Sequence, residues 1–224
     1  LNYKEMKSCV SYPNQPQNDF YFETETPHEE YPVIKKINTL LEEDERKYLI
    51  DKSYEIGLQR STVIGKDGIN RTDPNRTSST AFIDKSMDDI ITCIEKKISS
   101  ASGKPHDHLE PLQITHYGKD QKYNPHYDWL KNNSNQRTTT VFTYIKGFEN
   151  EMDTCGGATV FPKLKNENNN KLRFYPVSGT SIMWENVKEN GEGEELTLHG
   201  GEPVTCNSTK IGLNAWFREK PIEY

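Results

Sequence analysis

The stretch LQITHYGKDQKYNPHYDWL, residues 112–130, opens the half of the chain that decides the fold. It holds two short runs rich in β-forming residues, 111–118 and 123–129, and turn-forming residues separate them. Further runs of this kind follow at 137–147, 157–161, 171–177, 180–186, 196–205 and 210–218. About eight short strands at this spacing are typical of a double-sheet jelly roll. The sequence therefore predicts a mainly β, cupin-like double-stranded β-helix.

Two helices are predicted ahead of these strands, at 38–56 and 86–101. The first begins with the capping-box pattern Thr39-x-x-Glu42, and the second ends before Gly103. Each has an apolar stripe at helical spacing, so both are expected to pack on the outer face of one sheet. This combination predicts an α+β protein in which the N-terminal helices cover one sheet.

Two other segments frame these helices. Residues 1–32 contain four prolines and many polar residues, which predicts an extended N-terminal arm and a single domain over 33–224. Residues 61–79 form a predicted long loop of the kind that often acts as a lid. Its residues Gly65 and Gly68 would allow the backbone to move.

The composition excludes some classes of protein. The chain has 224 residues and a formal net charge of -6, which argues against a non-specific nucleic-acid binder. No apolar run approaches the ~20 residues that a membrane-spanning helix needs. The sequence starts without an initiator Met, and we expect that a targeting or anchor segment was removed.

The chain has four cysteines, Cys9, Cys93, Cys155 and Cys206, and none is in a C-x-x-C pattern. This spacing argues against a zinc site. Zero, one or two disulfides are compatible with the sequence, and the spacing does not choose among them.

The motif Pro125-His126-Tyr127-Asp128 points to a metal site. Residues i and i+2 of a strand face the same side, so His126 and Asp128 would both point into the barrel. His199, in the later run LTLHGGEPV, would be the third ligand. Two histidines and one carboxylate form the facial triad of non-haem Fe(II) oxygenases.

An isolated H-x-D match is weak, because a surface histidine and aspartate on a hairpin give the same pattern. Lys210 strengthens the prediction of a metal site, since it follows His199 by eleven residues and opens the β-like run KIGLNAWF. A buried ammonium there would pair with the far carboxylate of an acidic co-substrate, although an exposed lysine at a strand edge is the simpler alternative. His116, on an earlier strand, is expected to have a packing role.

At this point the chain resembles a known family, the catalytic domain of the prolyl 4-hydroxylases, in particular the collagen-type and the low-molecular-weight plant and algal enzymes. The resemblance covers roughly residues 33–219. The segments that match are LQITHYGKDQKYNPHYDWL (112–130), CGGATVFP (155–162), VSGTSIMWENV (177–187) and LHGGEPV…KIGLNAWF (198–217).

The resemblance implies roles for individual residues at the reaction centre. His126, Asp128 and His199 match the iron ligands of the family, and with Lys210 they form the implied catalytic set. Lys210 matches the lysine that pairs with the distal carboxylate of 2-oxoglutarate. The residues that would complete the co-substrate pocket are Tyr117, Thr159 and Trp216.

The resemblance also implies a peptide-binding groove. The residues that match it are Arg76, Ser78, Glu110, Tyr123 and Arg137. One position departs from the family pattern: eight residues after Lys210, where the family usually has a histidine, this chain has Arg218. We assign Arg218 to substrate binding, although its size and its titration differ from those of histidine.

The resemblance further implies an activity, namely hydroxylation of peptidyl proline to 4-hydroxyproline by O2, with Fe(II) and 2-oxoglutarate, giving succinate and CO2. L-Ascorbate would be the reductant, and the partner would be a proline-rich or collagen-like peptide. The resemblance favours a location in the endoplasmic reticulum lumen or at a membrane through an N-terminal anchor, and a cytoplasmic location is the alternative. Two alternatives remain: a 2-oxoglutarate oxygenase with another substrate, such as a lysyl residue or a small molecule, and a non-catalytic jelly-roll binding module.

Overall fold

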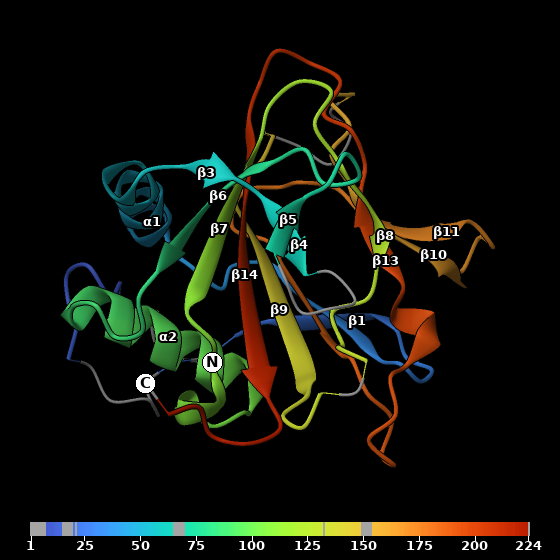
Figure 1. The fold of residues 1–224 in the computed structure, drawn as a ribbon, viewed down its shortest axis with the longest axis horizontal. Coiled ribbons are helices and arrows are strands. Elements are labelled where there is room, and N and C mark those ends of the chain that lie inside the picture. Colours follow the sequence, from blue (N-terminus) through green and yellow to red (C-terminus); the bar gives the residue numbers. More distant parts are fainter. Residues whose placement is uncertain are drawn as a thin grey trace.

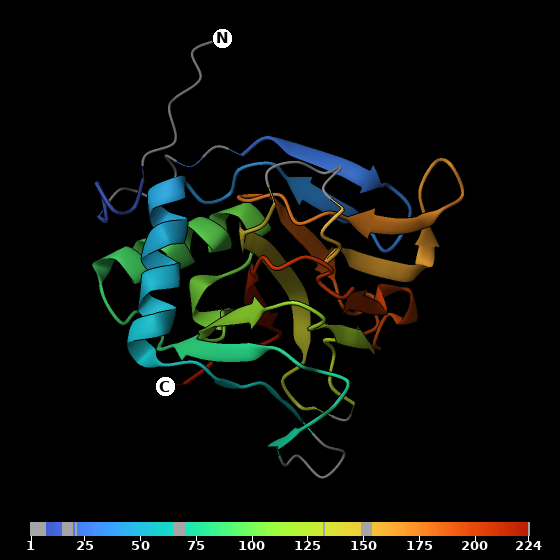
Figure 2. The same cartoon turned by 90° about the horizontal axis from the view of Figure 1, so that it is seen from above.

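The computed structural model describes residues 8–14, 20, 22–64, 70–131, 133–148 and 154–223 of the chain. Within these ranges two antiparallel sheets lie face to face, and two helices cover the outer side of the larger one (Figures 1 and 2). The helices are α1 (Glu43–Ile56) and α2 (Asp89–Ser102). This architecture confirms the prediction of a double-stranded β-helix with N-terminal helices on one sheet.

The larger sheet has eight strands in the order β1-β2-β12-β9-β14-β7-β6-β3, and the smaller sheet has four in the order β11-β10-β13-β8. The strands of the larger sheet are β1 (Thr24–His28), β2 (Ile34–Ile37), β3 (Gln59–Arg60), β6 (Ser79–Ile83), β7 (Leu112–Tyr117), β9 (Arg137–Lys146), β12 (Ser181–Glu185) and β14 (Lys210–Arg218). Those of the smaller sheet are β8 (Tyr123–His126), β10 (Thr159–Lys165), β11 (Lys171–Phe174) and β13 (His199–Gly201). A separate pair joins β4 (Thr62–Ile64) to β5 (Asn70–Thr72).

The side chains of β14 point alternately to the two faces of the larger sheet, one of which packs in an apolar core while the other borders a cavity. Leu213, Ala215 and Phe217 belong to the apolar core that the sheet shares with α1 and α2. The intervening residues Asn214 and Trp216 line a cavity on the other face. Because successive side chains of a strand point to opposite faces, this single strand positions both layers.

A second apolar core lies between the two sheets. It joins side chains of β2, β9 and β12 to side chains of β10 and β11 and consists of Ile34, Phe142, Tyr144, Phe161, Leu164, Leu172, Phe174, Ile182 and Trp184. Aromatic rings in edge-to-face contact fill much of it, for example Phe161 against Trp184, with 5.2 Å between ring centroids. This packing holds the smaller sheet, and the histidines on it, against the larger one.

Both helices begin later than predicted. The first was expected from residue 38, but Leu40 and Leu41 are both fully buried in a bent segment, and α1 starts at Glu43. The Glu45 carboxylate accepts the backbone N–H of Glu42 at 2.7 Å, so the cap forms one turn after the Thr39 pattern. At the second helix the cap is Asp88, whose Oδ1 accepts from the N–H of Ile91 at 2.8 Å.

Several strand predictions were wrong in their bounds, for example 157–161, where β10 runs from Thr159 to Lys165. The run 196–205 contains a short 3-10 turn, Glu195–Thr197, and then only the three residues of β13. Pro203 has no N–H to extend the ladder, which limits this strand. The strand predicted over 123–129 ends at His126, so Asp128 lies in the bend that follows β8.

The segments predicted as a loop and as an arm also contain strands. The range 61–79 includes β4 and β5, while Gly65 and Gly68 lie outside the described residues. Within 1–32, β1 pairs with β2 at the edge of the larger sheet. The domain boundary at residue 32 stays a prediction.

Two disulfides resolve the question that the cysteine spacing left open. Cys9 bonds to Cys93 and ties the N-terminal segment to α2. Cys155 bonds to Cys206 and joins the segment before β10 to the segment before β14. Neither described helix is long and apolar enough to cross a membrane.

Candidate metal centre

Two strands of the smaller sheet and the bend after one of them bring three ligand side chains together. His126 on β8 pairs in register with His199 on β13, and their ring centroids are 4.4 Å apart. Asp128 Oδ1 lies 3.7 Å from His126 Nε2, and Asp128 Oδ2 lies 3.7 Å from His199 Nε2. One ligand atom from each residue lies within 4.8 Å of the others, which is close enough for a single metal ion.

The backbone orients both imidazoles in the same way. His126 Nδ1 lies 2.9 Å from the carbonyl oxygen of Asn124, and His199 Nδ1 lies 2.9 Å from that of Thr197. A carbonyl can only accept, so each Nδ1 carries the proton and donates. Each Nε2 is then left with its lone pair, which is the arrangement of metal-binding histidines.

The protonation states of His126 and Asp128 allow them to bind a metal cation. Burial, with a smaller contribution from the neighbouring His199, lowers the pKa of His126 to about 3. Burial, the largest single effect, opposes ionisation of Asp128, but His199, His126, Arg137 and the Thr140 hydrogen bond together outweigh it and lower its pKa to about 2. At neutral pH the site therefore offers a neutral imidazole and a carboxylate, the forms that bind a divalent metal. Two nitrogens and one carboxylate oxygen fit Fe(II).

A chain of buried hydrogen bonds holds the carboxylate. Thr140 Oγ1 donates to Asp128 Oδ2 at 2.7 Å, and Asn186 Nδ2 donates to Thr140 Oγ1 at 2.8 Å. Trp184 Nε1 donates to Asn186 Oδ1 at 2.8 Å. Thr140 and Asn186 were not predicted, because nothing in the β-rich runs 137–147 and 180–186 distinguishes a supporting polar residue from any other.

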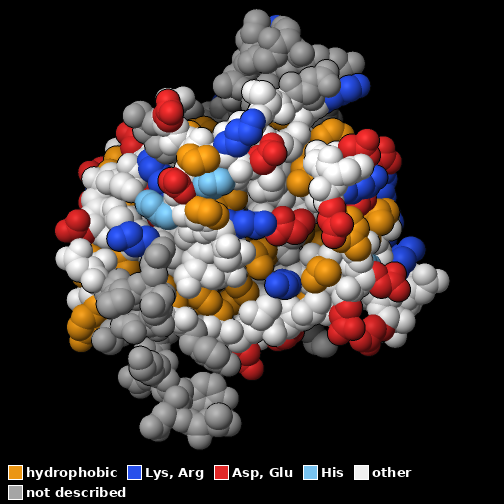
Figure 3. Space-filling view, turned by 90° about the horizontal axis from the view of Figure 1, so that it is seen from below, with side chains coloured by type: hydrophobic (Ala, Val, Ile, Leu, Met, Phe, Trp, Pro, Cys, Tyr) orange, Lys and Arg blue, Asp and Glu red, His pale blue; other side chains and the backbone are white. Residues whose placement is uncertain are grey.

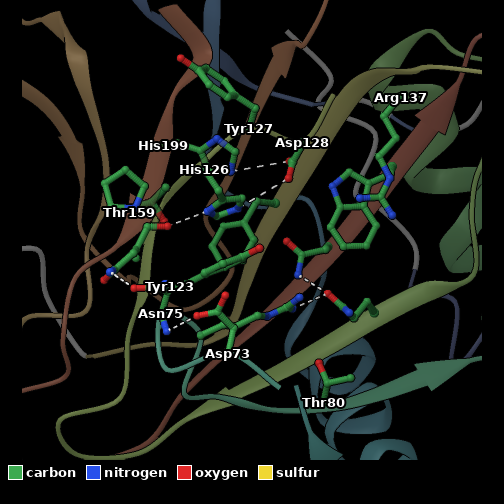
Figure 4. A pocket seen from close by; sticks show the side chains of 18 of the residues that line it. Asp73, Asn75, Thr80, Tyr123, His126, Tyr127, Asp128, Arg137, Thr159 and His199 are labelled. Atoms are coloured by element: carbon green, nitrogen blue, oxygen red, sulfur yellow. Dashed lines mark hydrogen bonds and ion pairs between the residues drawn. The ribbon is translucent and has the colours of Figure 1, made fainter. Parts of the chain in front are cut away.

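The three side chains lie at one side of a cavity of about 690 Å³ between the sheets (Figure 4). The predicted site residues that line it are Arg76, Tyr117, Tyr123, His126, Asp128, Arg137, Thr159, His199, Lys210 and Trp216. Three predicted residues are not among its lining: Ser78, Glu110 and Arg218. The separated segments of the sequence therefore converge on one site, with these three residues behind it.

Lys210 is buried at the start of β14 and only 1% exposed. Its Nζ donates to the carbonyl oxygen of Gly157 at 2.7 Å and lies 4.4 Å from the centroid of the Tyr117 ring. Burial lowers its pKa to about 7, and Glu202 only partly offsets this effect. A buried ammonium that borders a cavity and has a single carbonyl acceptor among the described residues fits an acidic ligand such as 2-oxoglutarate.

The backbone turn that faces Lys210 requires glycine at two positions. Gly156 and Gly157 have φ angles of +69° and +72°, a conformation that other residues rarely adopt. The resulting turn places the Gly157 carbonyl against Lys210 and leads into Thr159 on β10. Tyr144 fixes Thr159, since the Tyr144 hydroxyl lies 2.6 Å from Thr159 Oγ1 and accepts from its N–H at 3.0 Å.

An arginine and a tryptophan form another part of the cavity wall. The guanidinium carbon of Arg137 lies 3.8 Å from the Trp216 ring centroid. Arg137 Nε donates to Glu110 Oε1, and Arg137 Nη2 donates to Glu110 Oε2, each at 2.7 Å. Arg218 also pairs with Glu110, and its NH1 donates to the carbonyl oxygen of Asn135 at 2.7 Å. Glu110 and Arg218 thus support Arg137, and a direct contact of either with a substrate stays a prediction.

Arg76 and Tyr123 form the neighbouring part of the wall. The guanidinium carbon of Arg76 lies 4.7 Å from the Tyr123 ring centroid, and Tyr123 stacks on His126 with centroids 3.6 Å apart. Ser78 is fully buried, and its hydroxyl lies 2.8 Å from that of Ser61. Ser78 therefore links the segment before β6 to the segment before β4 and is not among the residues that line the cavity.

His116 has the packing role that was predicted for it. It is buried on β7, and its Nε2 lies 2.9 Å from the Ser53 hydroxyl on α1. Its ring meets Tyr54 edge-on, with 5.1 Å between centroids.

Comparison with known proteins gives a consistent result. Residues 112–218 match the model of the 2OG-Fe(II) oxygenase superfamily. Probable prolyl 4-hydroxylase 10 of Arabidopsis thaliana is 32% identical over 206 residues, which cover 84% of this chain and 69% of that protein. Probable prolyl 4-hydroxylase 3 of the same plant is 31% identical over 202 residues, and these cover 82% of this chain and 66% of that protein.

A solved structure is also similar. It is the 2OG complex of the viral collagen prolyl hydroxylase vCPH from Paramecium Bursaria Chlorella virus-1, with a TM-score of 0.64 and 26% identity. The match covers 83% of this chain and 95% of that one. The range matched by the family model, residues 112–218, includes all three residues of the metal-binding cluster.

Proposed function

Because this chain belongs to the prolyl 4-hydroxylase family of the 2OG-Fe(II) oxygenase superfamily, we propose that it hydroxylates peptidyl proline to 4-hydroxyproline. The observation that supports this most is the convergence of His126, Asp128 and His199 beside the buried Lys210 in one cavity. When bound, Fe(II) and 2-oxoglutarate supply the redox chemistry that inserts an oxygen atom of O2 into a C–H bond, with release of succinate and CO2.

The side chains of this protein set the geometry of that chemistry. His126 and His199 would bind the iron through Nε2, and Asp128 through its carboxylate, which Thr140 orients. Lys210 would pair with the distal carboxylate of 2-oxoglutarate, and Tyr117 and Thr159 would add hydrogen bonds to it. Trp216 would close the pocket at the opposite wall. Burial of these groups excludes water and strengthens each interaction.

We propose a proline-rich or collagen-like peptide as the partner. A polyproline II helix docks on aromatic and arginine surfaces, and Tyr123, Trp216, Arg76 and Arg137 provide such a surface along the cavity. We propose L-ascorbate as the reductant. The two disulfides support an oxidising compartment, for which the endoplasmic reticulum lumen is our proposal.

Turnover of a peptide panel tests this function. The protein is incubated with Fe(II), 2-oxoglutarate, O2 and proline-containing or lysine-containing peptides, and mass spectrometry then locates any added oxygen. We expect hydroxylation of proline, together with succinate, and the loss of both in Asp128→Ala and in His126→Ala. Oxygen on a residue other than proline, or peptide-dependent succinate in either variant, would refute the proposal.

A further inference from the structure

The cavity contains an excess of unused hydrogen-bond donors. Among the described residues, only four buried side-chain polar atoms lack a partner: Arg46 Nε, Arg76 Nε, Thr80 Oγ1 and Trp216 Nε1. The last three belong to residues that line the cavity beside the metal-binding cluster. Buried polar atoms without a partner are rare in proteins, so a group of three around one cavity points to a ligand that completes them.

The new element of this group is Thr80, which the sequence analysis did not single out. Thr80 lies on β6 and is 7% exposed, and Figure 4 shows it at the side of the cavity away from His126 and Asp128. Phe82, two residues further on the same strand, lines the same cavity and is 52% exposed. Strand β6 thus contributes a buried hydroxyl and, next to it, an exposed aromatic ring.

Other polar side chains that line the same cavity are held by hydrogen bonds. Gln113 Oε1, on the neighbouring strand β7, accepts from Arg76 NH2 at 2.9 Å and from Asn214 Nδ2 at 3.1 Å. Arg76 NH1 also donates to the carbonyl oxygen of Thr62 at 3.0 Å. These bonds fix the Arg76 guanidinium and leave its Nε as the unpaired donor.

The unpaired atoms define the chemistry of the ligand. Arg Nε and Trp Nε1 can only donate, and a threonine hydroxyl can donate as well. A ligand that satisfies them must present acceptors and needs few donors of its own. A proline-rich peptide has this property, because each proline keeps its carbonyl but has no backbone N–H.

We infer that Thr80, with Trp216 Nε1 and Arg76 Nε, forms a subsite that binds main-chain carbonyl oxygens of the residues flanking the target proline, while Phe82 contacts an adjacent proline ring. This inference rests on the proposed function and deepens it. It makes Thr80 a residue that sets preference for peptides with consecutive prolines.

Equilibrium binding of a peptide tests the inference without turnover. The probe is a fluorescein-labelled proline decamer, titrated with protein loaded with Fe(II) and 2-oxoglutarate in the absence of O2, and binding is followed by anisotropy. Thr80→Val keeps the shape but removes the hydroxyl, and we expect about fivefold weaker binding, as for loss of one neutral hydrogen bond. Thr80→Ser restores the donor and should bind as the natural protein does. Trp216→Phe, which keeps a ring without its N–H, should also weaken binding.

Thr115→Val is the matched control. Thr115 pairs with Thr80 in the sheet register, but its hydroxyl donates within the protein, to the carbonyl oxygen of Gly212 at 3.3 Å. We expect its peptide affinity to be unchanged. Equal affinity of Thr80→Val and the natural protein, or no binding of the decamer at all, would overturn the inference. Thr80-dependent binding without any hydroxylation would instead refute the proposed function alone.

Discussion

Lys210 shows how burial sets the chemistry of a single residue. Its ammonium is the cation that an acidic co-substrate needs, yet burial lowers its pKa to about 7. A carboxylate placed against it would raise that pKa again. Binding of the dicarboxylate above pH 7 is therefore coupled to proton uptake by this one side chain.

This coupling predicts the pH dependence of co-substrate binding. Between pH 7 and 9 the free Lys210 loses its proton, so the affinity for 2-oxoglutarate should fall by up to about tenfold per pH unit. In Lys210→Arg the guanidinium stays charged over this range, and the pH dependence should flatten even if the larger side chain weakens binding. Anaerobic calorimetry with Fe(II) present measures both slopes, and equal slopes would show that Lys210 is not the titrating group.

Thr140 allows a second test at the residue scale. Its hydroxyl links Asp128 to Asn186, so Thr140→Val would leave the carboxylate without its buried donor. Loss of such a supporting bond typically costs about 10–100-fold in metal affinity. Competition with a chelator measures this change. Thr143→Val, which removes a hydroxyl bonded to Ser181 on the other face of β9, is the control and should leave metal affinity unchanged.

At the scale of elements, the second disulfide supports the co-substrate pocket. Cys155 lies two residues before Gly157, whose carbonyl accepts from Lys210, and Cys206 lies four residues before Lys210. The disulfide therefore joins the two segments that place this contact. It also restricts the unfolded chain, and models of loop closure give a stabilisation of about 4 kcal/mol for its sequence separation of 51.

Removal of this disulfide should affect the binding of 2-oxoglutarate more than the binding of Fe(II). In the double variant Cys155→Ser and Cys206→Ser we expect the KM for 2-oxoglutarate to rise several-fold, while the affinity for Fe(II) changes little. The variant Cys9→Ser and Cys93→Ser is matched to it, because this pair lies far from the pocket, beside α2. Steady-state succinate release compares the two, and an equal rise in KM in both would contradict a local role.

The contact between α1 and β7 predicts an acid sensitivity of the fold. Burial, with a contribution from Lys146, lowers the pKa of His116 to about 4 from the ordinary value of 6.5. Below pH 6.5 the unfolded chain binds this proton first, so stability is complete above pH 6.5 and falls as the pH drops toward 4. We expect a loss of about 3 kcal/mol from this residue. Denaturant unfolding of His116→Gln should show a smaller loss over the same range, and an identical pH profile would exclude His116 as the cause.

Predictability from the sequence differed among the elements. Strands with strong alternation or β-branched runs, such as 112–117 and 210–218, were found almost to the residue. The start of α1 was not, because the buried Leu40 and Leu41 continue the apolar pattern of the helix in a segment that is bent. The strands β1 to β6 were missed, since each has only two to five residues and is defined mainly by the strand with which it pairs.

At the scale of the whole molecule, the pairing of strands in the two sheets brings residues that are far apart in the sequence close together. His126, His199 and Lys210 come from different strands, yet the antiparallel pairing of β8 with β13 and of β14 with β7 brings them to one cavity. Motif order and spacing could predict this set, because each residue lies in a β-rich run. Thr80, Thr140 and Asn186 could not be predicted, since their importance depends on contacts across the sheets.

The surface has no large area of a single charge on the face shown in Figure 3, where acidic and basic side chains are interspersed with apolar ones. The informative charges are instead inside, where Lys210, Arg76 and Arg137 border the same cavity as Asp128. Recognition of a ligand is therefore expected to depend on the cavity and its rim.

A crystal structure of the protein with Fe(II) and 2-oxoglutarate, obtained without O2 and with anomalous data collected at the iron absorption edge, would show whether these side chains hold the metal and the co-substrate. We expect one iron peak in contact with His126, Asp128 and His199, and a dicarboxylate whose far end reaches Lys210. An iron peak at any other position, or a co-substrate whose far carboxylate does not contact Lys210, would contradict it.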